Sequence, residues 1–306
     1  MSLILWTYVI AILTAVTCSL AGVYLVVKRE AFVSEGLSHA VLPGIIFAFL
    51  IFRDRGSPML VVAAGLSGLL MVWLTQAIVR TGRVKQDAAL GIVFSGMFSI
   101  GVIASSLKLK NIHFHAHCII DGNLAFATLD SFILRGIDFG PKAFVSMFGC
   151  LILLLSFVAV FYKELKLMAF DETASRLLGF RPKVLHTVWL ALVSLVAVAA
   201  FETAGTILVV ALMIAPPATA GLLTRRFVAM IFWSGGIAAV AAVIGVATSL
   251  KISIAPAGPI ASAAGVLFLL AALFAPATGL FSKWIRNQKK RANLIRAIER
   301  QSRVES

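Results

Sequence analysis

Long apolar runs separated by short polar segments dominate the chain, and few of them alternate between apolar and polar positions. Most have about 18–24 residues, the length at which a helix crosses a hydrocarbon core about 30 Å thick. Only helices and closed barrels satisfy their backbone groups in hydrocarbon, and the missing alternation argues against a barrel. The pattern predicts an all-α polytopic membrane protein with about nine spans, eight being the alternative. The expected spans are 4–27, 36–52, 57–79, 88–107, 140–162, 185–202, 204–223, 227–249 and 259–282.

Three breaks modify this pattern. Pro43-Gly44 lies in a short span, so we expect a kinked or broken helix there. Gly205 separates two nearly continuous runs and predicts a turn. Pro216-Pro217 and Pro43-Gly44 leave backbone carbonyls without their helical donors. Either these carbonyls line a pathway, or the residues are there for helix packing.

Composition supports a lipid environment. The 306 residues are 60% hydrophobic and 13% charged, about half the charged fraction of soluble proteins. Cys18, Cys118 and Cys150 show no paired spacing and predict no disulfide framework. Residues 1–27 lack a positive segment before the apolar run, so we interpret them as a retained first span rather than a signal peptide.

The basic residues predict an orientation. If the C-terminus is cytoplasmic, the cytoplasmic segments hold 20 of the 27 Lys and Arg residues. Since cytoplasmic loops carry an excess of such residues, we expect the N-terminus outside and the C-terminus inside a bacterial inner membrane. This topology accounts for the net charge of +14 without a nucleic-acid partner.

Residues 1–282 are expected to form the membrane domain and residues 283–306 a basic tail. The tail either lies on the anionic inner leaflet as an amphipathic helix or extends into solvent.

Two polar interruptions are longer than turns: 108–139 outside and 163–184 inside. In the inner one, residues 170–179 predict a short helix, with Asp171 and Glu172 in its first turn and Gly179 at the C′ position. Such a helix suggests a docking surface, although a structural connector is also open. The chain has no Gly-x-x-x-x-Gly-Lys-Ser/Thr loop, so any ATPase must be a separate chain.

Residues 34–44 read Ser-Glu-Gly-Leu-Ser-His-Ala-Val-Leu-Pro-Gly. This segment resembles the Gly-Asp-Ala-Ile-Ser-His-Ala-Val-Leu-Pro-Gly motif of the manganese/zinc/iron ABC permease family, with Ser34 in place of Gly and Glu35 in place of Asp. Residues 87–95, 167–179 and 205–220 resemble three further family stretches, in the same order. Residues 118–126 are most similar to the manganese-associated branch.

The resemblance implies a type II importer-like permease fold and no catalytic site. It also implies an ATP-binding cassette ATPase, an extracytoplasmic metal-binding protein and a second permease, identical or paralogous. The cargo would be manganese, zinc or iron, with no permanently bound cofactor. The residues implied to couple to the ATPase are Phe170, Asp171, Glu172, Ala174, Leu178 and Gly179.

Glu35 and His39 are four residues apart and therefore share one helical face, with the Ser38 hydroxyl nearby. A carboxylate and an imidazole make a usable half-site for Mn²⁺, Fe²⁺ or Zn²⁺. The competing interpretation is that His39 bonds to a neighbouring helix and Glu35 is interfacial.

Other candidates lie elsewhere. Glu202, between two apolar runs, either attracts the cation or is an ordinary polar residue at a turn. His113, His115 and His117 alternate in the outer loop, where three imidazoles can capture a metal or simply line a strand. His186 is interpreted as structural.

Three other functions are compatible with a polytopic membrane protein but fit this sequence less well. A secondary transporter would need more intramembrane carboxylates and no docking loop. An intramembrane metalloenzyme would need a His-Glu-x-x-His helix or a paired catalytic constellation, and the sequence shows neither. A permease for a metal chelate has the same fold but is less favoured by the motifs.

Overall fold

The computed structural model describes residues 3–53, 58–108, 124, 127–128, 131–134, 137–170, 175, 177–180, 182–224 and 226–275. Within these residues, nine helices are long and apolar enough to cross a membrane, which confirms the predicted number. They are α1 (Leu3–Lys28), α2 (Phe32–Phe52), α3 (Pro58–Arg80), α4 (Gln86–Lys108), α6 (Lys142–Val160), α9 (Pro182–Ala204), α10 (Thr206–Leu223), α11 (Phe227–Ile252) and α12 (Ala257–Phe274).

Gly205 is the reason that α9 and α10 are two helices. Its φ of 82° lies in the region that glycine adopts without a steric penalty. The amide of Gly205 still donates to the carbonyl of Phe201, and α10 restarts with the Val209 amide donating to the carbonyl of Gly205. The predicted turn is confirmed, and the described residues form nine candidate spans rather than the alternative of eight.

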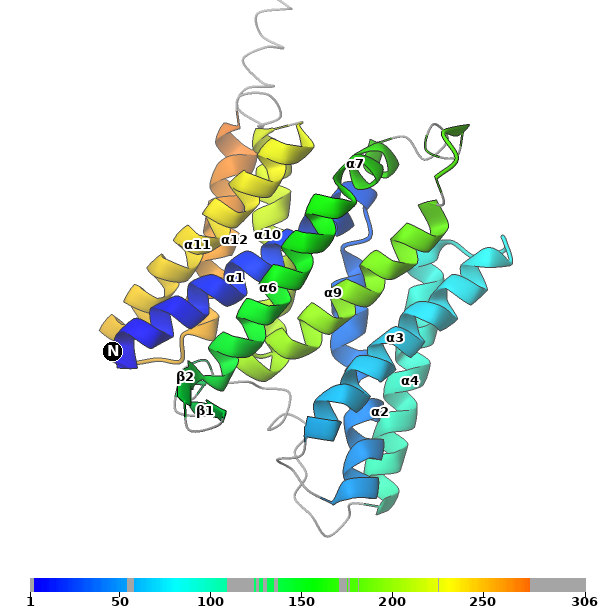
Figure 1. Cartoon of the computed structure of the whole chain (residues 1–306), viewed down its shortest axis with the longest axis horizontal. Coiled ribbons are helices and arrows are strands. Elements are labelled where there is room, and N and C mark those ends of the chain that lie inside the picture. The colour runs from blue at the N-terminus through cyan, green and yellow to red at the C-terminus, as the bar shows by residue number, and fades with distance from the viewer. Residues whose placement is uncertain are drawn as a thin grey trace, which may run out of the picture.

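Short elements mark the two ends of the molecule (Figure 1). The helix α7 (Tyr162–Phe170) lies at one end, and an antiparallel ribbon of β1 (Ser131–Leu134) and β2 (Ile137–Pro141) lies at the other. The ribbon was not predicted. Its sequence signal is the pair Arg135-Gly136 between two runs rich in strand-forming residues.

The spans form two groups around α1 and α9. In Figure 1 the helices α10, α11 and α12 lie on one side and α2, α3 and α4 on the other. Helix α1 packs against α10, α11, α6 and α9, and α9 also contacts α3 and α2. An aromatic cluster joins α1, α6 and α9, because the ring centroid of Trp189 lies 5.4 Å from that of Tyr24 and 6.0 Å from that of Phe157.

Proline and glycine allow the closest helix contacts. Pro217 has no amide hydrogen, so the carbonyl of Met213 loses its helical donor. That carbonyl lies against Gly22 of α1, where a Cβ atom would clash with it. On the other side of the molecule, Pro43 packs against Gly101 of α4, where an added Cβ atom would lie 3.1 Å from the Pro43 nitrogen.

Helix α2 differs from the prediction in two ways. It continues through Pro43 as one helix, so the expected break does not occur. It also begins at Phe32 rather than near residue 36, which places Glu35 and His39 inside the helix. Pro43, Pro216 and Pro217 are all buried, as the helix-packing interpretation requires.

We expect Gly22→Ala to destabilise the protein by about 1–3 kcal/mol, because the new methyl group forces α1 away from α10. Thermal unfolding of the purified chain in nanodiscs measures this effect. Gly236→Ala is the matched control, since no atom lies within 4 Å of a Cβ atom built there. The control should be neutral or more stable, and equal losses in both variants would contradict the packing argument.

Candidate functional site

Glu35 and His39 form a pair on one face of α2. The His39 Nε2 atom lies 3.2 Å from Glu35 Oε1. The imidazole ring stacks on Phe94 of α4 and meets Phe98 edge to face, with ring centroids 5.5 and 5.3 Å apart. Ser38 does not join the pair in the structure, because its hydroxyl donates to the backbone carbonyl of Glu35 over 2.7 Å. The spacing argument for a shared face is therefore correct, and two phenyl rings of α4 hold the imidazole in place.

This pair is open toward the exterior of the chain. The side chain of His39 is 40% exposed and that of Glu35 is 42% exposed. Ionisable groups facing hydrocarbon are costly, so this face suits a water-filled path or contact with another protein chain. No group of three or more His, Cys, Asp or Glu side chains that could hold a metal occurs in the described part of the chain. A metal ion bound at this pair would have two donor atoms from Glu35 and His39 and would take its other ligands from water or a partner.

Glu202 lies far from this pair along the membrane axis. It is in the last turn of α9, whereas Glu35 is in the first turn of α2, and both helices start at the same end of the molecule (Figure 1). Lys142 Nζ donates to Glu202 Oε1 over 3.0 Å, beside a cavity of 70 Å³ that Ser146 and Thr203 also line. The structure does not bring Glu202 together with Glu35 and His39.

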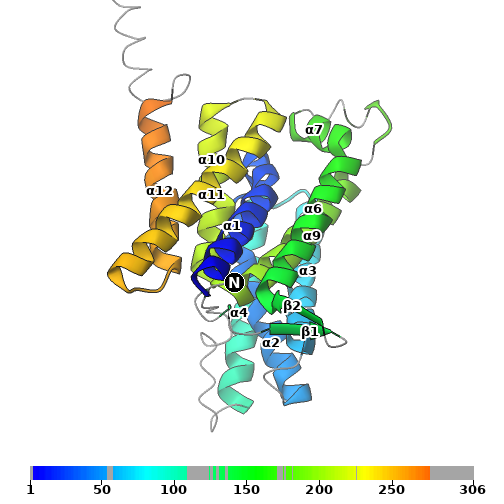
Figure 2. The ribbon, with the colours of Figure 1, turned by 60° about the vertical axis from the view of Figure 1, so that its left-hand side comes forward.

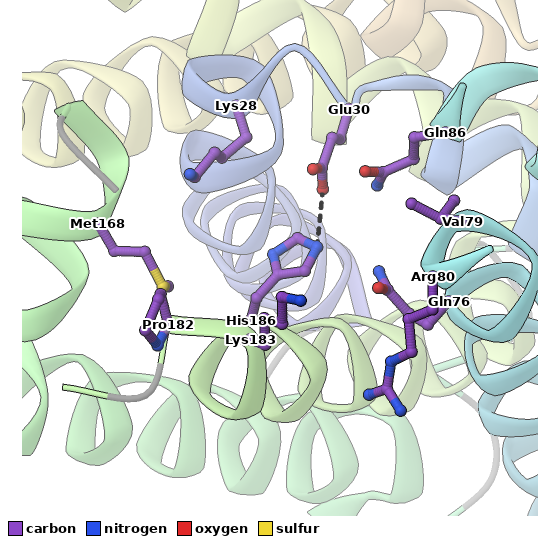
Figure 3. A pocket seen from close by; sticks show the side chains of 10 residues that line it. All are labelled: Lys28, Glu30, Gln76, Val79, Arg80, Gln86, Met168, Pro182, Lys183 and His186. Carbon is purple, nitrogen blue, oxygen red and sulfur yellow. Dashed lines mark ion pairs between the residues drawn. The ribbon is translucent and has the colours of Figure 1, made fainter. Parts of the chain in front are cut away.

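A second carboxylate–imidazole pair escaped the sequence analysis. Glu30 lies in the turn between α1 and α2, and its Oε2 atom is 3.3 Å from Nε2 of His186 in the first turns of α9. Figure 3 shows this pair at a cavity of 290 Å³ lined also by Lys28, Arg80 and Lys183. The two side chains are only 12% and 15% exposed. The structural interpretation of His186 fits this geometry, and the one available signal for Glu30 was an acid directly after Lys28-Arg29.

Only part of the expected coupling helix is described. Gly179 has a φ of 82°, and the Phe180 amide donates to the carbonyl of Ser175 over 3.2 Å. This is the Schellman arrangement, so the C′ position predicted for Gly179 is confirmed. Leu178 is 67% exposed beside it. Phe170 ends α7, without a described side chain. The predicted sites Asp171, Glu172, Ala174, His113, His115 and His117 lie outside the described residues.

The sequence model of the ABC 3 transport family matches residues 1–275. The chain belongs to this family. The chain is a multi-pass membrane component of a transporter, and the predicted resemblance to metal ABC permeases is confirmed by this match and by the relatives described next.

Relatives of this ABC 3 family chain carry names of metal transport systems. It is 36% identical to the manganese transport system membrane protein MntD of Bacillus subtilis, over 95% of this chain and 100% of the relative. It is 38% identical to the zinc transport system membrane protein TroD of Treponema pallidum, over 89% and 74%. The chelated iron transport system membrane protein YfeD of Yersinia pestis is 34% identical, over 87% and 82%.

Solved structures confirm the fold of the family. PsaBC from Streptococcus pneumoniae in complex with Fab superposes with a TM-score of 0.74 at 24% identity, covering 94% of this chain and 96% of that one. An inward-facing metal-chelate type ABC transporter gives a TM-score of 0.66 at 14% identity, covering 88% and 85%.

The burial of the two inter-helix pairs predicts different costs of losing a carboxylate. Glu30→Ala leaves the mostly buried His186 without this acceptor and should lower the free energy of unfolding by about 2 kcal/mol. Glu202→Ala removes one partner of an exposed pair and should cost less than about 1 kcal/mol. Thermal unfolding in nanodiscs compares the two variants, and a larger loss at Glu202 would contradict the assignment.

Proposed function

We propose that this chain is the membrane-spanning subunit of an ATP-driven importer for a divalent transition metal ion, with manganese as the first candidate and zinc and iron next. The observation that supports this most directly is the exposed Glu35–His39 pair within a spanning helix. A carboxylate oxygen and an imidazole nitrogen are donors that Mn²⁺, Fe²⁺ and Zn²⁺ all accept. The names of the relatives cover the same three metals.

The pair acts as half of a transient metal site. Two atoms 3.2 Å apart are close enough to bind one ion from adjacent coordination positions. A second permease, identical or paralogous, brings its own pair to the same path and covers the exposed face. Few protein ligands suit a transport site, because an ion that enters must also leave.

Partners complete the importer. The chain carries no phosphate-binding loop of its own, so a separate ATPase drives the cycle, and an extracytoplasmic protein delivers the metal. The exposed end of the 163–184 segment, with Leu178 and Gly179, is the docking surface for that ATPase. The motion of the ATPase passes through α7 to the spans. Glu202 and Lys142 lie at the outer mouth of the path.

The orientation follows from charge. Lys28, Arg80, Lys163, Lys183 and Arg226 lie at the end of the molecule where α7 is found. By the positive-inside rule this end faces the cytoplasm, with the N-terminus outside.

The decisive experiment is ATP-dependent uptake of radioactive Mn²⁺, Zn²⁺ and Fe²⁺ by proteoliposomes containing this chain with its ATPase and binding protein. We expect Glu35→Gln and His39→Ala each to reduce uptake of the cargo metal about tenfold or more, since even indirect supports of metal ligands contribute that much. The control Lys251→Gln changes one charge at an exposed residue in the last turn of α11 and should retain most uptake. Normal uptake by both pair variants would refute the half-site, and no ATP-dependent uptake of any metal would refute the metal assignment.

The docking surface predicts a separable defect. Leu178→Asp places a charge on an exposed apolar residue and should lower co-purification of the ATPase about tenfold. Thr81→Asp is the control, because Thr81 lies in the exposed turn between α3 and α4 at the same end. Pull-down of the tagged ATPase measures both. If both variants retained the ATPase equally, the ATPase would have to dock at another segment.

A further inference from the structure

A cavity of 760 Å³ lies between α7 and the start of α11, apart from the Glu35–His39 pair and from the Glu30–His186 cavity. Figure 2 shows the beginning of α11 close to α7, at the end of the molecule that carries the basic turns. The walls of the cavity come from residues on α7 and α11 and from Arg226, which precedes α11. The cavity therefore lies where spanning helices leave the hydrocarbon.

Among the described residues, two cations line the cavity and no acid does. They are Lys166 of α7 and Arg226. Across the residues that the structure describes, neither side chain has an ion pair or hydrogen bond. Unpaired cations facing one cavity form a complementary site for an anion.

The helix itself adds to this preference. Phe227, Val228 and Ala229 form the first turn of α11 and line the same cavity. Their amides precede the first helical hydrogen bond, which the Met230 amide donates to the carbonyl of Arg226, and no side chain caps them. Amides at such a position favour negative charge.

The remaining wall is aromatic and apolar. Phe232 is 75% exposed and Trp233 is 54% exposed, and both line the cavity with Tyr162, whose ring lies 6.4 Å from that of Phe227. Tyr and Trp side chains gather at the membrane interface, where one part of the ring is apolar and the other is wet. A ligand that matches both walls has an anionic head and an apolar tail.

We propose that this cavity binds the headgroup of an anionic phospholipid. Lys166 and Arg226 contact the headgroup phosphate, and the acyl chains lie along Phe232 and Trp233. A free phosphate ion satisfies the cations but not the aromatic wall, and a zwitterionic lipid satisfies the wall but cancels the charge. In the proposed orientation the lipid belongs to the inner leaflet, next to the segment that docks the ATPase.

The test measures phospholipid binding to the full-length chain by native mass spectrometry and by titration with a fluorescent phosphatidylglycerol in detergent. Wild type should bind phosphatidylglycerol in preference to phosphatidylcholine. The double variant Lys166→Gln/Arg226→Gln should bind it roughly 25-fold more weakly, because each cation near a lipid surface contributes about fivefold. The double variant Arg83→Gln/Lys85→Gln removes the same charge from exposed residues at the same end and should bind like wild type.

The conservative pair Lys166→Arg/Arg226→Lys should retain binding, which separates lost charge from lost folding. Equal weakening in the Arg83/Lys85 variant would show general attraction to a basic surface and overturn the site. Equal binding of phosphatidylcholine, or competition by inorganic phosphate as effective as that by lipid, would overturn it as well. These measurements involve no transported metal and no ATPase, so their failure is distinct from failure of the importer assignment.

Discussion

Hydrocarbon tolerates neither an unpaired backbone group nor an isolated charge, and this constraint governs the whole chain. It makes every described span a helix. It also explains why three carboxylates at or near the spans each lie beside a basic group: Glu30 with His186, Glu35 with His39 and Glu202 with Lys142. Two of these pairings, Glu30–His186 and Glu202–Lys142, connect different elements, and the third lies within α2. The interactions that make the charges tolerable therefore also help to hold the helices in place.

Close packing in such a protein cannot come from removing apolar groups from water, because lipid is as apolar as the helix surfaces. Small residues at the contacts allow the close packing of the helices instead. Gly22 admits the Met213 carbonyl that Pro217 leaves without a donor, and Gly245 lies against the backbone of Ile260 where α11 meets α12. Gly101 admits Pro43 in the same way and holds α4 against α2. Because Phe94 and Phe98 belong to α4, this contact also supports the rings that orient His39.

Much of this fold was predictable because it depends mainly on the length of each apolar run, which is visible directly in the sequence. Apolar length identified nine spans, and the single residue Gly205 separated two of them. The Glu35–His39 pair was predictable for the same reason, since residues four apart on a helix must meet. The Glu30–His186 pair was not, because its partners are 156 positions apart and only helix packing brings them together. The continuity of α2 through Pro43 was also missed, since local sequence does not reveal that Gly101 of α4 lies against that proline.

The two glutamate–histidine pairs contain the same donors at nearly the same separation, 3.2 and 3.3 Å, and differ chiefly in exposure. Glu30 and His186 are enclosed by α1, α9 and their neighbours, with Lys28, Arg80 and Lys183 around the adjoining cavity. Those cations repel a divalent ion and favour a pair that remains intact as a connection between helices. Glu35 and His39 keep two-fifths of their surface open and have aromatic rings rather than cations beside the imidazole. Under the proposed function, an arriving metal ion displaces the contact between Glu35 and His39 and completes its shell with water or a second chain. In the proposed importer, environment and not the identity of the donors therefore distinguishes the pair that contacts the metal, Glu35–His39, from the pair that connects helices, Glu30–His186.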